Sequence, residues 1–367
     1  GTAAAETLFG WSGNDIIHGG DGNDTLSGGA GANQLYGDAG DDTIMVAAAS
    51  KGNTLVGGTG NDTLTGGNYA DTYVFNLGDG KDVITDYDGG FVATDTLRFG
   101  AGILASDIQV LKSGSDVAFK HRNGIDQVTV KGWLDGTSIS AGAVINNIIE
   151  RVEFADGTFW TSADIAATGL SQVGTAAAET LTGWSGNDII HGGDGNDTLS
   201  GGAGANQLYG DAGDDAIMVA AASKGNTLVG GTGNDTLTGG NYADTYVFNR
   251  GDGNDVVTDN DGGYVATDTL EFGADISPQD LWFRRSGSDL EISVVEATEK
   301  LTVSNWYQSS AYHIEAFKTA DGKGLLDSQV QNLVDKMSSF GVPAGAETSL
   351  TTDQRTQLDA VLAANWK

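Results

Sequence analysis

The stretches Gly19–Ser27, GGDGNDTLS, and Gly57–Thr65, GGTGNDTLT, show the repeat that decides the fold. Both have glycine at positions one, two and four, aspartate at position six and leucine at position eight. Glycine permits left-handed backbone angles in tight loops, so we expect the three glycines to adopt them. A single apolar residue in a short strand can point inward. Each nine-residue unit should therefore form a six-residue loop and a three-residue strand.

The nine-residue period continues on both sides of these stretches, from Gly1 into the turn around Lys81. Position six is Glu6 in the first unit and asparagine in two others, Asn33 and Asn53, where we expect weaker or absent sites. In the remaining units it is an aspartate: Asp15, Asp24, Asp42, Asp62, Asp71 and Asp82. Two units would form one coil of a right-handed parallel β-roll, with coils stacked about 4.8 Å apart.

A longer repeat duplicates the whole unit after 173 residues. Gly1–Asn76 and Gly174–Asn249 differ only where Phe9 becomes Thr182 and Thr43 becomes Ala216. The second copy therefore predicts a second roll with its own row of aspartates: Asp188, Asp197, Asp215, Asp235, Asp244 and Asp255.

The regions after each roll lose the nine-residue period. Alternating apolar runs separated by turns predict a small antiparallel β capping region in each case. In the last stretch, Val330, Leu333 and Met337 follow helical spacing, and Thr351 with Gln354 predicts the start of a second helix. We thus expect an all-β chain with a short helical end, divided into a first roll at 1–85, a first cap at 86–173, a second roll at 174–258, a second cap at 259–323 and helices at 324–367.

Composition excludes several classes of function. Fifty acidic and 18 basic residues give a formal net charge of −32, which argues against binding to nucleic acids or anionic membranes. The chain has no cysteine, and no apolar stretch approaches the roughly 18 residues of a membrane span. Without an initiating methionine or a signal peptide, we expect a fragment of a longer protein.

The repeats resemble the RTX (repeats-in-toxin) haemolysin-type family, whose nonapeptide is GGxGxDxUx. The best matches are Gly19–Ser27, Gly57–Thr65 and their copies at Gly192–Ser200 and Gly230–Thr238. The resemblance implies several Ca²⁺ ions per roll, held between stacked coils by the aspartates above and by loop carbonyl groups. It also implies loop ligands at Gly19, Gly22, Gly28, Gly57, Gly60, Gly192, Gly195, Gly201, Gly230 and Gly233.

Stacked carboxylates also require a cation on physical grounds. Two of them about 5 Å apart repel by on the order of 3 kcal/mol at an effective dielectric of 20, and each strand buries only one side chain against this. Flexible loops of hard oxygen atoms suit Ca²⁺, whereas Zn²⁺ would require histidine or cysteine. We therefore expect the rolls not to form without calcium.

The family resemblance implies an extracellular protein, secreted or at the cell surface, that passes unfolded through a type 1 secretion channel. The terminal helices are interpreted as the export signal or, alternatively, as a cap on the second unit. No HExxH or GxSxG motif occurs, so we predict no catalysis in this chain. Two other functions remain open: a cell-surface adhesin that binds glycans through Trp133, Phe154 and Trp160 or through Trp306, and the tail of a secreted enzyme or toxin.

Overall fold

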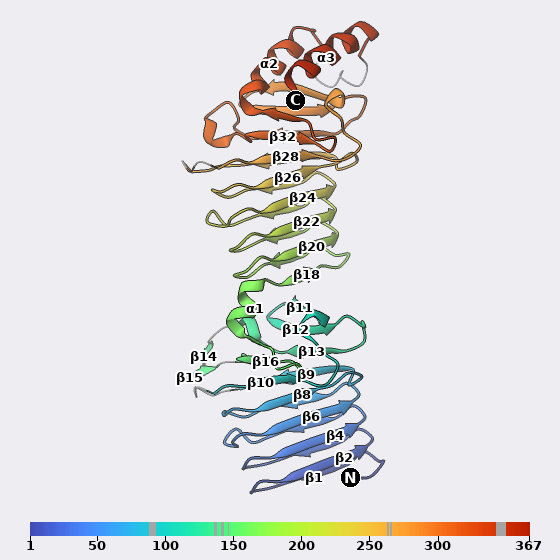
Figure 1. Cartoon of the computed structure of the whole chain (residues 1–367), viewed down its shortest axis with the longest axis vertical. Coiled ribbons are helices and arrows are strands. Elements are labelled where there is room, and N and C mark those ends of the chain that lie inside the picture. The colour runs from blue at the N-terminus through green and yellow to red at the C-terminus, as the bar shows by residue number, and fades with distance from the viewer. Residues whose placement is uncertain are drawn as a thin grey trace. The chain divides into compact units, whose positions relative to one another are not determined.

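The computed structural model describes residues 1–87, 93–135, 138–140, 143–145, 147–262, 264, 266–342 and 350–367. It contains two compact units, Gly1–Ala167 and Thr168–Lys367, which we describe one at a time (Figure 1). No helix in these ranges is long and apolar enough to cross a bilayer.

The first unit begins with a parallel β-solenoid. One row of strands is short: β1 (Thr7–Phe9), β3 (Thr25–Ser27), β5 (Thr43–Met45), β7 (Thr63–Thr65) and β9 (Lys81–Thr85). The facing row has longer strands except at its end, where β8 has four residues and β9 has five: β2 (Ile16–Asp21), β4 (Gln34–Ala39), β6 (Thr54–Thr59) and β8 (Thr72–Phe75). Each strand pairs in parallel with its counterpart one coil later, as Leu8 does with Leu26 and Ile17 with Leu35. The predicted parallel roll is thus confirmed.

Position eight supplies the core of the roll. Its side chains are stacked inside the solenoid and are completely buried from the third turn onward, for example at Leu26, Leu35 and Ile44. Leu8 and Ile17, in the first two turns, are only half-buried. One inward side chain per turn therefore forms a continuous but narrow apolar column.

The first capping region continues the solenoid before it turns antiparallel. Three of its strands, β10 (Thr96–Phe99), β13 (Gln127–Val130) and β16 (Arg151–Glu153), join the roll in parallel. The antiparallel strands are β11 (Ile108–Ser113), β12 (Asp116–His121), β17 (Phe159–Thr161), β14 (Ser138–Ser140) and β15 (Ala143–Ile145). The expected antiparallel cap is therefore partly parallel, because the backbone ladders of the roll extend through Thr96 and Gln127.

Short helical segments complete this region: η1 (Ala105–Asp107), η2 (Trp133–Asp135) and α1 (Ser162–Thr168).

The second unit repeats this plan. Its short-strand row is β19 (Thr180–Thr182), β21 (Thr198–Ser200), β23 (Ala216–Met218), β25 (Thr236–Thr238) and β27 (Asn254–Thr258), extended by β31 (Lys300–Val303), β30 (Asp289–Val294) and β29 (Leu281–Ser286). Its long-strand row is β18 (Ser171–Val173), β20 (Ile189–Asp194), β22 (Gln207–Ala212), β24 (Thr227–Thr232), β26 (Thr245–Phe248), β28 (Thr269–Phe272), β32 (Ala316–Thr319) and β33 (Gly324–Leu326). Two 3₁₀ segments, η3 (Pro278–Asp280) and η4 (Ser310–Tyr312), connect these strands.

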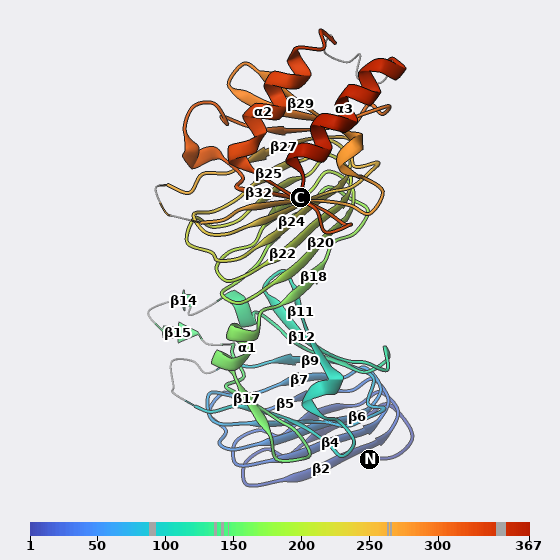
Figure 2. The same cartoon turned by 45° about the horizontal axis from the view of Figure 1, so that its top comes forward.

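Two helices close the chain, α2 (Asp327–Ser338) and α3 (Thr352–Asn365), and Figure 2 shows them beside the capping strands of the second unit. Thr351 caps α3 and forms a capping box with Gln354, as predicted. Leu333 and Met337 of α2 and Leu362 of α3 belong to the buried core of this unit. The helices are therefore packed elements of the second unit.

Candidate metal centre

The position-six carboxylates form a continuous ladder along the loops that precede the short strands. In each rung the backbone N–H of one acidic residue donates to Oδ1 of the acidic residue one coil later. The distances are 2.7 Å from Glu6 to Asp24, from Asp24 to Asp42 and from Asp42 to Asp62, and 3.0 Å from Asp62 to Asp82. We call this the acidic ladder; its counterpart in the second unit runs through Glu179, Asp197, Asp215, Asp235 and Asp255.

The second carboxylate oxygen of each aspartate in this ladder lacks a partner. These Oδ2 atoms are buried and have no hydrogen-bond donor among the described residues: Asp24, Asp42, Asp62, Asp82, Asp197, Asp215, Asp235 and Asp255. Buried polar atoms are nearly always satisfied in proteins, and an unpartnered carboxylate oxygen is especially costly. A repeated row of them indicates a site for cations.

Position-one glycines keep the space beside six of these oxygens clear, whereas Leu77 and Arg250 stand at position one in the units of Asp82 and Asp255. A methyl group built on Gly19 would lie 2.6 Å from both Asp24 Oδ2 and the Gly37 carbonyl oxygen. On Gly57 it would lie 2.2 Å from Asp62 Oδ2. Carboxylate and carbonyl oxygens thus converge on one point, and both are ligands that Ca²⁺ prefers, at 2.3–2.6 Å. The donor set fits calcium.

This finding corrects one expectation about the glycines. Positions two and four have left-handed backbone angles, with φ of 97° at Gly20 and 99° at Gly22. Position one does not, because no positive φ occurs at Gly19 or Gly57. Among the predicted loop ligands, Gly19, Gly28, Gly57, Gly192, Gly201 and Gly230 are the position-one glycines, and Gly22, Gly60, Gly195 and Gly233 provide the left-handed turns.

The loops before the long strands form a second ladder with different chemistry, which we call the amide ladder. In the first unit it runs from Asp15 through Asn33 and Asn53 to Asp71, with backbone-to-side-chain distances of 3.1, 3.0 and 2.9 Å. Asn53 Nδ2 also donates to Asp71 Oδ1 at 2.7 Å, and Gly67 N donates to Asp71 Oδ2 at 2.7 Å. The side-chain amides thus provide donors that the acidic ladder lacks.

The second unit repeats the amide ladder with Asp188, Asn206, Asn226 and Asp244. The predicted ligands are therefore divided between two edges of each roll. In each roll, the two asparagines that replace a position-six carboxylate lie on the same edge, in consecutive coils.

When no metal is bound, the buried carboxylates of the acidic ladders raise the pKa values of their own members. Burial, with repulsion from neighbouring carboxylates, raises the pKa of Asp62 to about 7 and of Asp82 to about 8. In the second unit the same causes raise the pKa of Asp235 to about 7 and of Asp255 to about 8. Each acidic ladder thus resists full ionisation without a compensating cation.

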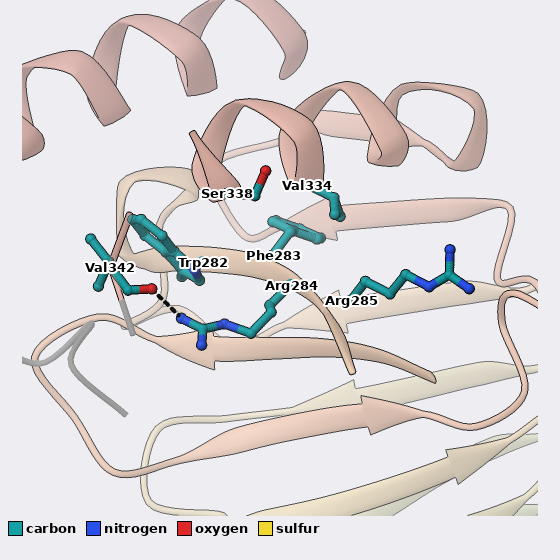
Figure 3. Close-up of a pocket in the computed structure, with 7 residues that line it drawn as sticks. All are labelled: Trp282, Phe283, Arg284, Arg285, Val334, Ser338 and Val342. Atoms are coloured by element: carbon teal, nitrogen blue, oxygen red, sulfur yellow. Dashed lines mark hydrogen bonds between the residues drawn. The ribbon is translucent and has the colours of Figure 1, made fainter. Parts of the chain in front are cut away.

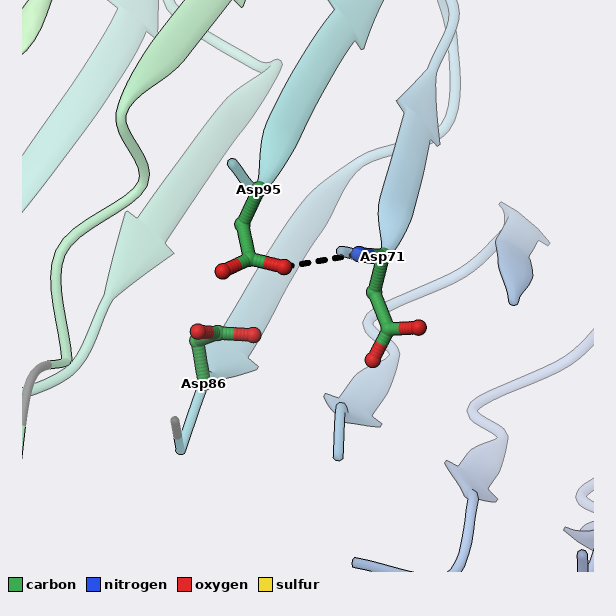
Figure 4. Close-up of side chains that lie close together, drawn as sticks. All are labelled: Asp71, Asp86 and Asp95. Atoms are coloured by element: carbon green, nitrogen blue, oxygen red, sulfur yellow. Dashed lines mark hydrogen bonds between the residues drawn. The ribbon is translucent and has the colours of Figure 1, made fainter. Parts of the chain in front are cut away.

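One acidic group was not predicted from the sequence. Asp86 and Asp95 lie beyond the nonapeptide repeats, yet Figure 4 shows both pointing toward Asp71, and one oxygen of each residue lies within 4.8 Å of the others. Asp95 Oδ1 accepts a hydrogen bond from Asp71 N at 2.7 Å, which extends the amide ladder by one rung. The duplicated Asp95-Thr-Leu and Asp268-Thr-Leu sequences were the available signal.

A pocket of about 220 Å³ lies between β29 and α2 in the second unit (Figure 3). Trp282, Arg284, Arg285 and Val334 line it, and Arg284 Nη2 donates to the Val342 carbonyl oxygen at 3.2 Å. The described residues that line it include two guanidinium groups and no carboxylate, so it is unsuitable for a cation.

Comparison with known protein families also indicates calcium-binding repeats in this chain. The RTX calcium-binding nonapeptide repeat matches residues 1–34, 9–44, 49–82, 173–208, 182–217 and 222–257, and the haemolysin-type calcium binding protein related domain matches 116–164 and 289–327. Among solved structures, the extracellular lipase LipA from Serratia marcescens shares 19% identity at a TM-score of 0.25, over 79% of this chain and 37% of that chain. At that score the likeness carries no inference, and this chain spans little more than a third of the lipase. The chain belongs to the RTX family, with haemolysin-type calcium-binding nonapeptide repeats in both of its rolls.

Proposed function

We propose that this chain is a calcium-responsive folding and export region of a larger extracellular protein. The acidic ladders carry the proposal, because their aspartates have buried Oδ2 atoms that lack a donor among the described residues and lie beside carbonyl oxygens. A folded roll without cations keeps these charges buried and unpaired, which is strongly unfavourable. In calcium-poor cytosol the chain stays unfolded and can pass through a type 1 secretion channel.

Outside the cell, calcium at roughly 10⁻⁴–10⁻³ M, the range of extracellular modules, drives folding. Only the folded state holds complete sites, so the free energy of calcium binding becomes free energy of folding. Several ions per roll, bound along each acidic ladder by aspartate and glycine-loop oxygens, would make the transition steep. The chain itself acts as a non-catalytic module in this proposal.

The terminal helices have a structural role in the folded state, since Leu333, Met337 and Leu362 lie in the core of the second unit. This supports the cap interpretation. An export signal would then be read from the unfolded chain, before these side chains are buried.

The burial of three of its four aromatic residues argues against the glycan-binding alternative. Trp133 and Trp306 are buried, with 1% and 4% of their surface exposed. Phe154 is buried and contacts Phe99 and Trp160 in the core, with ring centroids 5.5 and 4.7 Å apart. Trp133, Phe154 and Trp306 are therefore core residues, whereas Trp160 is only partly buried.

Circular dichroism with added calcium tests the proposal. We expect a mostly unfolded chain in chelator, a cooperative gain of β-structure below about 1 mM Ca²⁺, and no comparable gain with equal Mg²⁺, which binds only in a tighter octahedron. Equal β-structure in excess chelator and in calcium would disprove calcium-dependent folding.

A further inference from the structure

Five carboxylates meet where the second roll joins its cap, outside the nonapeptide loops of the acidic ladder. Asp244 precedes β26, Asp259 follows β27, Asp268 precedes β28 and Glu315 precedes β32, while Asp261 lies in the loop between β27 and β28. One oxygen each of Asp244, Asp259 and Asp268 lies within 4.8 Å of the others, and the same holds for Asp261, Asp268 and Glu315. We call these five residues the cap cluster.

Three oxygens of the cap cluster are buried without a partner. Asp259 Oδ2, Asp261 Oδ1 and Asp268 Oδ2 have no hydrogen-bond donor among the described residues. The first and third belong to side chains with no exposed surface, and Asp261 is 5% exposed. No described Lys, Arg or His forms an ion pair with any of the five residues. Buried carboxylates in this state need either a proton or a cation, and five of them so close together offer an oxygen-rich site for a cation.

The surrounding residues hold these carboxylates in fixed positions. Tyr246 is fully buried, and its hydroxyl donates to Asp259 Oδ1 at 2.6 Å. The backbone N–H of Asp244 donates to Asp268 Oδ1 at 2.7 Å, and that of Asp268 donates to Glu315 Oε2 at 2.8 Å. A methyl group on Gly239 would lie 2.5 Å from Asp259 Oδ1 and 2.9 Å from Asp244 Oδ2, so glycine keeps this space clear.

The same arrangement recurs at the end of the first roll. Tyr73 donates to Asp86 Oδ1 at 2.5 Å, Asp71 N donates to Asp95 Oδ1 at 2.7 Å, and Asp95 N donates to Glu150 Oε2 at 2.8 Å. The sequences of the two copies diverge after Asn76 and Asn249, yet both caps retain this arrangement of carboxylates. A junction held together only by apolar packing would not need these carboxylates.

We propose that the cap cluster binds Ca²⁺ and that this ion fastens the capping region to the roll. Asp244 precedes a strand of the roll and Asp259 directly follows its last strand, whereas Asp268 and Glu315 directly precede two strands of the cap. A cation between them therefore joins two elements that the nonapeptide sites do not join. The inference rests on the proposed calcium binding by the rolls and assigns calcium a second, separate task.

Equilibrium dialysis with ⁴⁵Ca²⁺ on the full chain tests the site. The test variant is Asp268→Asn with Glu315→Gln, since both amides keep an oxygen for the backbone donors. We expect it to bind at least one Ca²⁺ fewer per chain than the unmodified protein. Hydrogen exchange in β28 and β32 should become at least tenfold faster, while exchange in β22 and β24 stays unchanged. The matched control, Glu271→Gln with Asp275→Asn, removes the same charge from exposed positions of the same region and should bind the full number.

The outcomes separate this inference from the proposed function. If the unmodified chain binds calcium and the test variant binds the same number with the same affinity, the cap cluster is not a site although the rolls remain calcium modules. If the unmodified chain binds no calcium, both proposals fail. Should the double variant not fold in calcium, Asp261→Asn alone replaces it, because no ladder hydrogen bond depends on that side chain. It should weaken one site at least tenfold, and unchanged binding would overturn the inference.

Discussion

At the scale of single residues, the position-six aspartate has one oxygen for the backbone and one for a cation. Oδ1 of Asp62 accepts the N–H of Asp42 at 2.7 Å, and Oδ2 of Asp62 has no hydrogen-bond partner in the described part of the chain. This division explains why asparagine can replace aspartate structurally but not as a ligand. The amide oxygen still accepts the backbone N–H, whereas the amide nitrogen occupies the place of the second ligand oxygen.

Asp62→Asn should therefore keep the roll folded in calcium but weaken one site. Loss of a charged ligand should raise the calcium concentration needed at that site by at least tenfold, which corresponds to about 1.4 kcal/mol. Calorimetric calcium titration measures the effect. Asp41→Asn, an exposed change of equal charge one position before Asp42, serves as the control and should titrate like the unmodified chain. Equal titrations of both variants would argue against Asp62 as a ligand.

Gly57→Ala tests whether position-one glycines keep the calcium space clear. Its methyl group would lie 2.2 Å from Asp62 Oδ2, so we expect the loss of one bound Ca²⁺ per chain. Gly78→Ala is the contrasting variant, because it has φ of 94° but open space around its Cα. It should cost about 1 kcal/mol of stability through backbone strain and keep all bound calcium. A full calcium count in Gly57→Ala would refute this role.

At the scale of elements, each roll has one edge that needs cations and one that largely satisfies itself. The side-chain amides of Asn33 and Asn53 donate hydrogen bonds within the amide ladder, whereas the side chains of the acidic ladder can only accept them. Calcium should therefore act mainly along the loops that precede the short strands. Along its middle, through the asparagines, the other edge contributes hydrogen bonds that do not depend on metal, and in the second roll the cap cluster lies at its end.

Asn33→Asp combined with Asn53→Asp should convert the self-satisfied edge into a calcium-dependent one. Removing the Asn53 Nδ2 donor leaves Asp71 Oδ1 facing another carboxylate, so residual structure in chelator should fall. The slope of folding free energy against the logarithm of calcium concentration should rise by about one ion. Asn14→Asp with Asn23→Asp adds the same charge at exposed positions and should leave the slope unchanged. An unchanged slope in the first variant would contradict the two-edge account.

The sequence predicted the roll and the row of aspartates because a strict nine-residue period fixes both the turns and the inward side chain. It did not predict the parallel strands of the caps, since β10 and β16 lie in segments without that period. Asp86 and Asp95 were missed for the same reason: their approach to Asp71 depends on how the cap folds back. The role of the position-one glycine could not be predicted from the sequence either. Glycine is needed both where a Cβ atom would meet a nearby oxygen and where φ is left-handed, and the sequence does not distinguish the two cases.

At the scale of the whole molecule, the acidity of the chain couples its folding to its surroundings. The metal-free folded state holds aspartates with pKa values of about 7 and 8 at Asp62 and Asp82, against about 4 for the same groups in an unfolded chain. It therefore binds more protons than the unfolded state between about pH 4 and pH 8. Its stability is greatest at the acidic end and falls as pH rises through this window.

In chelator, the rolls should consequently gain β-structure when the pH is lowered from 7.5 to 5. Saturating calcium should largely remove this dependence near neutral pH, since bound ions take the place of the protons. Thermal unfolding followed by circular dichroism at several pH values measures both effects. Metal-free stability that stays constant or rises between pH 5 and pH 8 would contradict the electrostatic argument.

The most direct test of calcium binding by the acidic ladders is a crystal structure of the chain grown with calcium and measured with X-rays at a long wavelength. Anomalous difference peaks should appear next to Oδ2 of Asp24, Asp42 and Asp62 and of their counterparts Asp197, Asp215 and Asp235, each with a loop carbonyl oxygen at 2.3–2.6 Å. Fully assembled rolls without anomalous density at these carboxylates would contradict the account.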